Sequence, residues 1–191
     1  MANQVEKFGF RPVRKLDGSP FINAQNRYRI ASNYGTAIFQ GDLVVPVADG
    51  TIARHIAANT SAVVGVFNGC FYTDPTTQKP TWKNYYPGSV VASDITAFVL
   101  DDPDIVGKMD CDGAFAVADI FKDFNVTNVS GNTQTGISEV QLDFSASGLT
   151  SDFIVQAIDI SQNPDNDTAA SANVNVLVRI NNHFYRLQNG L

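Results

Sequence analysis

Short apolar runs alternate with polar positions along most of the chain, and turn signals rich in Gly, Pro, Asn and Asp separate them. Alternation with a period of two is typical of β-strands that bury one face. The clearest examples are residues 27–30, 51–56, 95–100, 139–144, 153–160 and 174–180. Because short strands recur at intervals of roughly 8–12 residues, the pattern predicts an all-β domain, a single sandwich or barrel of many short antiparallel strands.

Three stretches depart from plain alternation. The run 62–67 is apolar throughout, which favours a strand buried on both faces. The alanine-rich segment 113–121 fits either a strand or one short helix, the best helix candidate in the chain. Residues 73–87 combine Thr, Pro, Lys and aromatic side chains, and we expect a loop there. No internal repeat and no clear linker divides the rest of the body.

The charge of the first 30 residues differs from that of the remainder. They hold six basic and two acidic side chains, a net charge of +4, whereas the remainder holds seven basic and seventeen acidic ones, a net charge of −10. We therefore divide the chain into a basic N-terminal arm with the first strand (1–30) and a β-rich body (31–191). A basic arm on an acidic body indicates a protein that docks onto a surface.

The arm itself is expected to be extended, because Gly9 and Pro12 oppose a helix. In an extended backbone Phe8 and Phe10 point to the same side and could serve as apolar anchors in a partner. The candidate contact residues of the arm are Phe8, Phe10, Arg11, Arg14 and Lys15. The alternative is that the two phenylalanines cover the end of the protein's own barrel, and the sequence leaves both interpretations open.

Composition narrows the class of partner. Charged residues make up only 17% of the chain, below the roughly 25% of an average globular protein, so much of the surface is uncharged and polar. The net charge of −6 argues against nucleic acid as the main partner. Residues 1–15 are polar and basic, and no apolar run approaches a membrane-spanning length. We expect neither a signal peptide nor a membrane span, and synthesis in a cytoplasm.

Candidate metal and redox chemistry is sparse. Two cysteines, Cys70 and Cys111, are expected to be reduced core residues. The densest carboxylate cluster, Asp101, Asp102 and Asp104, fits either a calcium site or a solvated acidic turn, and Asp110 and Asp112 lie nearby in the sequence. Because the ligand spacing of an EF-hand loop is missing, we favour the turn. We also expect a turn without a metal ion in the acidic segment 165–167. We expect no metal and no cofactor.

Candidate catalytic residues are also lacking. The two histidines, His55 and His183, have no nearby nucleophile in the sequence, and no Gly-x-Ser-x-Gly or phosphate-binding motif occurs. We expect no catalytic residue and no enzymatic activity. Three aromatic residues in the expected loop, Trp82, Tyr85 and Tyr86, could stack on sugars or fill an interface pocket. The alternative, which we favour, is that they form a small core beneath the loop.

Several short motifs, taken in order, resemble the head decoration or cement proteins of tailed-bacteriophage virions. The resemblance runs from residue 9 to residue 183 through the segments 9–14, 26–28, 41–44, 64–66, 99–104, 135–138 and 178–183. It implies a virion protein that coats the outside of a capsid shell and strengthens it, often as a trimer on local three-fold positions. It offers no catalytic residue.

The leading hypothesis from the sequence is therefore a structural protein on the capsid exterior, made in the cytoplasm of a bacterial host. It would bind the major capsid protein and itself, as a homotrimer, and bridge neighbouring subunits. Nucleic acid and membrane are not expected partners. The alternative is a carbohydrate-binding β-sandwich on the virion surface that uses the loop from Trp82 to Tyr86. A small hydrolase using Asp101–Asp104 or His183 is a third hypothesis, weakened by the missing nucleophile–base pair.

Overall fold

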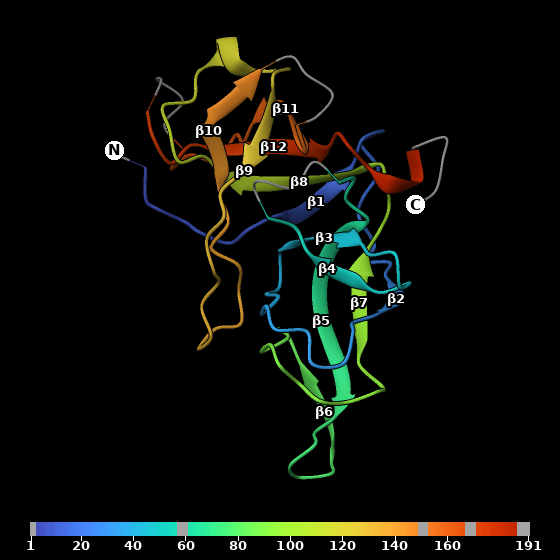
Figure 1. Ribbon diagram of the computed structural model, residues 1–191. Helices are drawn as coiled ribbons and strands as arrows, with labels where there is room; N and C mark the ends of the chain where they lie inside the picture. Colours follow the sequence, from blue (N-terminus) through green and yellow to red (C-terminus); the bar gives the residue numbers. More distant parts are fainter. Residues whose placement is uncertain (1–2, 57–60, 149–152, 167–170, 187–191) are drawn as a thin grey trace.

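The structure is a computed structural model that describes residues 3–56, 61–148, 153–166 and 171–186. Within these residues the chain forms two antiparallel sheets packed as a sandwich (Figure 1), so the all-β prediction is confirmed. Sheet A has the order β1 (Arg11–Lys15), β8 (Ile105–Asp110), β12 (Asn175–Ile180), β11 (Val155–Ile160), β9 (Asp123–Val126) and β10 (Leu142–Gly148). Sheet B has the order β2 (Asn26–Arg29), β7 (Thr96–Leu100), β5 (Gly65–Thr73), β3 (Leu43–Pro46) and β4 (Ile52–Arg54), with β6 (Pro80–Lys83) paired to β5.

Two apolar cores lie on opposite faces of sheet B. The first core lies between the sheets and joins buried residues of sheet A to Leu43, Val45, Val66 and Leu100 of sheet B. The second core covers the other face of sheet B with loop residues such as Ile38 and Tyr86. Each fully buried aliphatic or aromatic side chain contributes about 1.5–3 kcal/mol, so both cores are needed to hold sheet B in place.

The apolar run 62–67 supplies both cores, as the sequence predicted. Val63 and Val66 belong to the first core, whereas Val64 and Phe67 belong to the second. None of these side chains is more than 1% exposed. Because neighbouring residues of a strand point to opposite faces, a segment that is apolar at every position can only be accommodated between two cores.

Two segments differ from the sequence-based expectation. Residues 73–87 are not a loop throughout, because Pro80–Lys83 forms β6 and pairs with the end of β5. Pro80 lies at the first position of this edge strand, where the missing N–H costs no ladder hydrogen bond. In the segment 113–121 only Val117–Asp119 is regular, as one turn of 3-10 helix, η1; a second single turn, η2, spans Phe184–Arg186.

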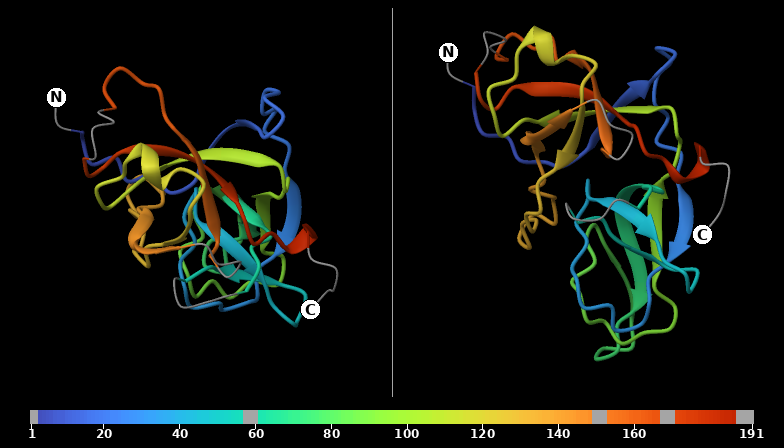
Figure 2. Two further views of the ribbon diagram at one scale, coloured as in Figure 1. Left: turned by 90° about the horizontal axis from the view of Figure 1, so that it is seen from above. Right: turned by 45° about the horizontal axis from the view of Figure 1, so that its top comes forward.

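The N-terminal segment supplies one strand to each sheet. β1 pairs with β8 in sheet A, and β2 pairs with β7 in sheet B. Figure 2 shows the same segment (dark blue) passing along sheet A before the chain enters sheet B. The residues that the sequence assigned to an arm and first strand are thus hydrogen-bonded to the body at 11–15 and 26–29.

Just before β1 the N-terminal segment crosses the segment that leads into β3. The Phe10 amide donates to the Gly41 carbonyl at 2.8 Å. Gly9 and Gly41 both have positive φ angles, +67° and +94°. A methyl group on Gly9 would lie 2.6 Å from the Gly41 oxygen, and one on Gly41 would lie 2.7 Å from the Phe8 oxygen. Glycine is therefore required on both sides of this crossing.

We expect Gly9→Ala to destabilise the fold by about 3 kcal/mol, because the new methyl group meets backbone and the positive φ is strained. Urea unfolding measures the change. Gly50→Ala is the matched control, since Gly50 also has a positive φ, +80°, but nothing lies within 4 Å of the added methyl group. The control should lose only about 1 kcal/mol. Equal losses in the two variants would show that the crossing is not a tight contact.

Candidate functional site

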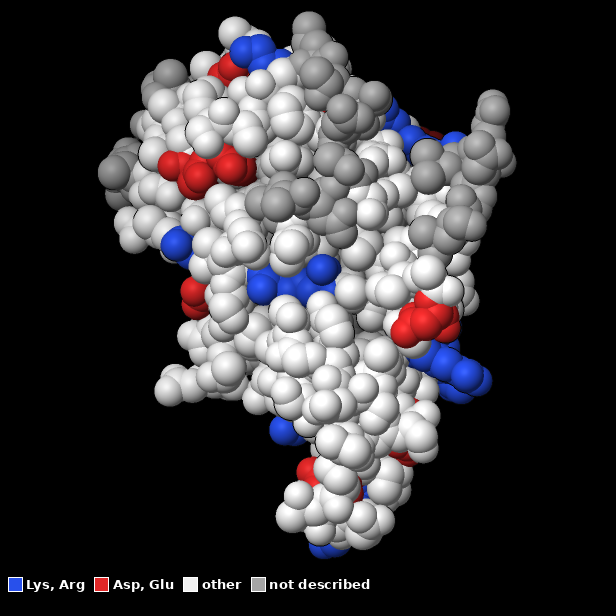
Figure 3. Space-filling model, viewed as in Figure 1, with Lys and Arg blue, Asp and Glu red and all other residues white. Residues whose placement is uncertain are grey.

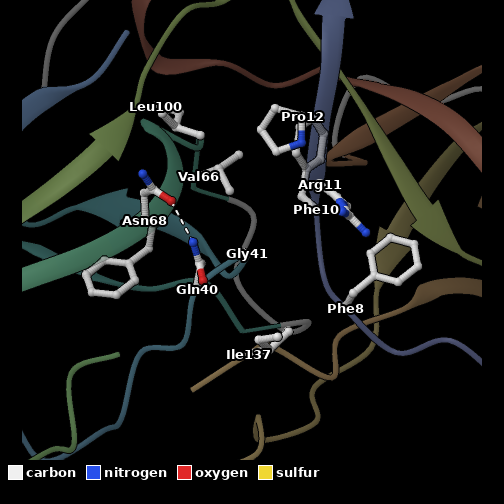
Figure 4. A pocket seen from close by; sticks show the side chains of 11 residues that line it. Phe8, Phe10, Arg11, Pro12, Gln40, Gly41, Val66, Asn68, Leu100 and Ile137 are labelled. Carbon is white, nitrogen blue, oxygen red and sulfur yellow. Dashed lines mark hydrogen bonds between the residues drawn. The ribbon is translucent and has the colours of Figure 1, made fainter. Parts of the chain in front are cut away.

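A half-open pocket of about 300 Å³ lies beside the crossing, between the start of β1 and sheet B. We call it the arm pocket (Figure 4). Side chains from both sheets and from the loop after β9 line it: Phe8, Phe10, Arg11, Pro12, Gln40, Val66, Phe67, Asn68, Leu100 and Ile137, with the backbone of Gly41. The lining is mostly apolar, and one basic side chain, Arg11, stands at its edge.

The two arm phenylalanines have different roles. Phe10 is only 1% exposed and belongs to the first core, so its prediction as an exposed anchor is wrong. Its ring packs on Gly107 of β8, where any side chain would collide with it. Phe8 is half-buried, and the Lys108 ammonium lies 5.0 Å from its ring centroid. Of these two phenylalanines, only Phe8 therefore leaves part of its surface available to a ligand in the pocket.

Amide side chains make up the polar part of the pocket. Gln40 Nε2 donates to Asn68 Oδ1 at 2.8 Å, shown as the dashed line in Figure 4. Asn68 Nδ2 in turn donates to Gln25 Oε1 at 2.9 Å. The Ser138 amide donates to the Gln40 carbonyl at 2.9 Å, which positions Ile137, 38% exposed, at the pocket edge. These contacts hold the pocket walls in one arrangement before anything binds.

A buried polar network behind the pocket fixes the same loop. Asp42 is almost fully buried, and its carboxylate lies 3.1 Å from Arg54 Nε. The Ser138 hydroxyl donates to Asp42 Oδ1 at 2.6 Å, and the Phe39 amide donates to Oδ2 at 2.8 Å. Burial raises the pKa of Asp42, and the Arg54 charge opposes that shift. Removing one partner of such a network leaves the other unpaired and costs several kcal/mol.

The other two basic candidates for a contact, Arg14 and Lys15, form contacts outside the pocket. Arg14 Nη1 donates to the neighbouring Lys15 carbonyl at 3.0 Å. Lys15 Nζ lies 2.8 Å from Asp102 Oδ2, and this hydrogen-bonded ion pair raises the pKa of Lys15. The structure therefore brings Phe8, Phe10 and Arg11 to the arm pocket but not Arg14 or Lys15.

The three aromatic residues for which the sequence left a surface site and a small core open do not share one environment. Tyr86 is fully buried, and its hydroxyl donates to the Tyr34 carbonyl at 2.9 Å, so the core alternative is confirmed for this residue and the surface alternative is wrong. Tyr85 stacks on Phe39 with ring centroids 5.4 Å apart. Trp82 alone is well exposed, at 58%. Its cross-strand neighbour is Phe71, which is 39% exposed and was not predicted as a surface residue.

The acidic turn is held by ordinary polar contacts. Asp101 accepts from the Tyr28 hydroxyl at 2.6 Å and from Asn26. Asp102 pairs with Lys15, and Asp104 with Arg186. Within the described ranges no group of three or more His, Cys, Asp or Glu side chains is placed to hold a metal ion. Asp101, Asp102 and Asp104 therefore belong to a polar turn at the surface, whereas Asp110 is buried and lies apart from it.

The other candidate residues have structural environments. His183 is buried, its Nδ1 accepts from the Tyr185 amide, and burial lowers its pKa to about 4. Asn166 is buried and donates to the Ser161 and Asn175 carbonyls, whereas Asp167 lies outside the described residues. Cys70 and Cys111 are free and buried, as predicted, and burial raises both thiol pKa values to about 12.

Comparison with known proteins returns no match to a family model, to a curated protein or to a solved structure. Among the described residues, no helix has the length and apolar character needed to cross a membrane. The arm pocket and the exposed aromatic pair are therefore interpreted from their own chemistry.

Asp110 should make stability depend on pH. It is buried opposite Asn175 and accepts from Gln141 Nε2 at 2.8 Å. Burial raises its pKa to about 6, so the folded protein binds this proton more tightly than the unfolded chain. Stability is then lost as the pH rises from about 4 to about 6. We expect Asp110→Asn to abolish this loss, which is about 3 kcal/mol.

Urea unfolding at several pH values between 4 and 7 measures this difference. Asp165→Asn, at an exposed position, is the control and should follow the parent protein across the range. If Asp110→Asn and the parent lose stability in parallel, the carboxyl group titrates near its ordinary pKa and the assignment fails.

Proposed function

We propose that the protein is a structural protein of a virion that decorates the outer surface of a capsid shell. It binds the major capsid protein and stabilises the shell by bridging neighbouring subunits, without catalysis. The observation that carries the proposal is the arm pocket: an open, mostly apolar pocket with one basic side chain at its edge, built where the N-terminal segment meets both sheets. The order of sequence motifs from residue 9 to residue 183 supports the same class of protein.

The pocket suits one or two side chains of a protein partner. Its volume of about 300 Å³ is at the lower end for small-molecule sites. An apolar side chain of the shell would lie against Phe8, Val66 and Ile137. A neighbouring carboxylate would accept a bidentate hydrogen bond from Arg11, which is exposed. Because hydrogen bonds fix the walls in advance, little ordering cost accompanies binding.

A shell presents many identical copies of such a contact. Each copy of the protein would add a weak contact, and a homotrimer on a three-fold position would engage several subunits at once. Figure 3 supports a role on a broad protein surface, because charged side chains form small separate groups among uncharged atoms on the face shown. The proposed location is the capsid exterior, reached after synthesis in a bacterial cytoplasm.

Cryo-electron microscopy of virions, or of shells reconstituted with the protein, tests the proposal. Density for the protein at regular symmetric positions, with the arm pocket facing the shell, is the expected result. Shells that remain undecorated at saturating protein concentration would overturn the proposal.

The double variant Arg11→Glu, Ile137→Glu should bind shells at least ten-fold more weakly than the parent protein. It places two carboxylates at the pocket edge, where an apolar and acidic partner is expected. Co-sedimentation with shells at two salt concentrations measures the change. The double variant Thr76→Glu, Lys79→Glu changes the net charge by the same amount at exposed sites outside the pocket; it is the control and should bind normally. Equal weakening of both variants would show that the pocket is not the contact.

Carbohydrate binding is a second candidate function, favoured by the exposed pair Phe71 and Trp82. Two neighbouring aromatic rings on an open strand pair offer flat apolar surfaces on which sugar rings stack. This function would use the β5–β6 hairpin, on a part of sheet B that is separate from the arm pocket.

A further inference from the structure

A surface of exposed and half-buried side chains lies on one face of sheet B, at the end of the sheet that is farthest from sheet A. We call it the aromatic platform. Strand register places these side chains on one face, because residues directly opposite in antiparallel strands share a face. Phe71 lies opposite Trp82 on β6 and opposite Thr96 on β7. Thr96 in turn lies opposite Arg29 on β2, and Phe98 lies opposite Arg27. The platform is therefore made of Phe71, Trp82, Thr96, Phe98, Arg27 and Arg29.

The opposite face of the same strands is fully used by the protein itself. Cys70, Tyr72 and Ala97 alternate with the platform residues and lie in the second core. The platform face also continues toward sheet A, where Leu100 lies in the first core. The β5–β6 hairpin points away from sheet A, at the bottom of Figure 1 and of the right-hand view of Figure 2. The platform is the part of this face that sheet A does not reach.

The tryptophan is supported by the sheet beneath it. A methyl group on Gly69 would lie 3.0 Å from Trp82 Cζ2, so the indole ring leans over a position that has no side chain. One side of the ring is thus held by the backbone of β5, while the residue as a whole stays 58% exposed. A ring held in this way loses little conformational entropy when a ligand stacks on it.

Two arginines flank the rings. The Arg27 guanidinium lies 5.9 Å from the Phe98 ring centroid, which positions it over the platform. Both Arg27 and Arg29 are exposed, and no carboxylate of the described residues forms an ion pair with either. The platform therefore combines flat apolar surfaces with two positive charges that are available for an acidic ligand.

The size of the platform favours a narrow ligand over a protein. At their observed exposures Trp82 and Phe71 present on the order of 200 Å², whereas a standard protein interface buries about 800 Å² on each partner. Four neighbouring strands span roughly 14 Å from β6 to β2. A sugar chain crossing them can place rings on the aromatic side chains and a carboxylate at the arginines.

We infer that the aromatic platform binds an acidic polysaccharide, with sugar rings stacked on Trp82 and Phe71 and a carboxylate held by Arg27 and Arg29. This inference rests on the second candidate function and specifies its ligand class. Single-stranded nucleic acid also stacks on aromatic rings beside arginines, but the net charge of −6 opposes a polyanion with a charge on every unit. Nucleic acid is therefore an outcome of the test.

The experiment uses matched pairs of sugars. Fragments of hyaluronan, unsulfated chondroitin and heparosan, which carry a carboxylate on every second sugar only, are each compared with the same fragment after esterification of its carboxylates, which keeps the rings and removes the charge. Trp82 is the only tryptophan in the chain, so its fluorescence reports binding at the platform directly. We expect at least one acidic fragment to bind, and its ester to bind at least ten-fold more weakly.

Three variants assign the contacts, with calorimetry as the readout and circular dichroism to confirm folding. Trp82→Ala should abolish binding of the acidic fragment. The double variant Arg27→Gln, Arg29→Gln should weaken that binding at least ten-fold and leave binding of the ester unchanged. Lys79→Gln removes an exposed positive charge of the 73–80 loop, off the platform, and should change neither.

The outcomes separate the inference from the function on which it rests. Equal binding of an acidic fragment and its ester, both lost in Trp82→Ala, would preserve carbohydrate binding and overturn the acidic ligand class. No binding of any fragment would overturn both. Tighter binding of oligothymidylate than of every sugar would assign the platform to nucleic acid and overturn the inference.

Discussion

The close approach of two backbones at Gly9 and Gly41 is the contact on which the arrangement of the two sheets depends. It brings the N-terminal segment against the segment that enters sheet B, with a hydrogen bond from Phe10 to Gly41. From this point β1 joins sheet A, and the Phe10 ring enters the core between the sheets. The arm pocket lies beside this crossing and is lined by residues of both segments, among them Phe8 and Phe10 on one side and Gln40 and Gly41 on the other.

Buried polar groups reinforce this crossing from the side of the 130–138 loop. Asp42 receives hydrogen bonds from Ser138 and Phe39 and pairs with Arg54. A buried ion pair adds little net stability to a fold compared with a hydrophobic pair of the same shape. The main effect of this network is therefore to fix the position of the 130–138 loop. Its effect is to give the pocket a fixed wall at Ile137.

Most strands could be predicted from the sequence, whereas the residues exposed at the candidate binding surfaces could not. Alternation in 95–100, 153–160 and 174–180 and the apolar run 62–67 correspond to β7, β11, β12 and the start of β5. The sequence did not predict β6, because Pro80 and Lys83 are residue types that are uncommon in strands. The burial of Phe10 and Tyr86, and the exposure of Phe71, are set by partners distant in sequence, which no local pattern contains.

Strand β5 contributes side chains to both cores, and this affects how the protein unfolds. Val66 holds the strand to sheet A, and its neighbour Phe67 holds it to the loops on the other side. A fluctuation that frees one of these side chains also displaces the other, since both belong to a single rigid backbone. We therefore expect cooperativity to extend across the sandwich, so that its two halves unfold as one unit.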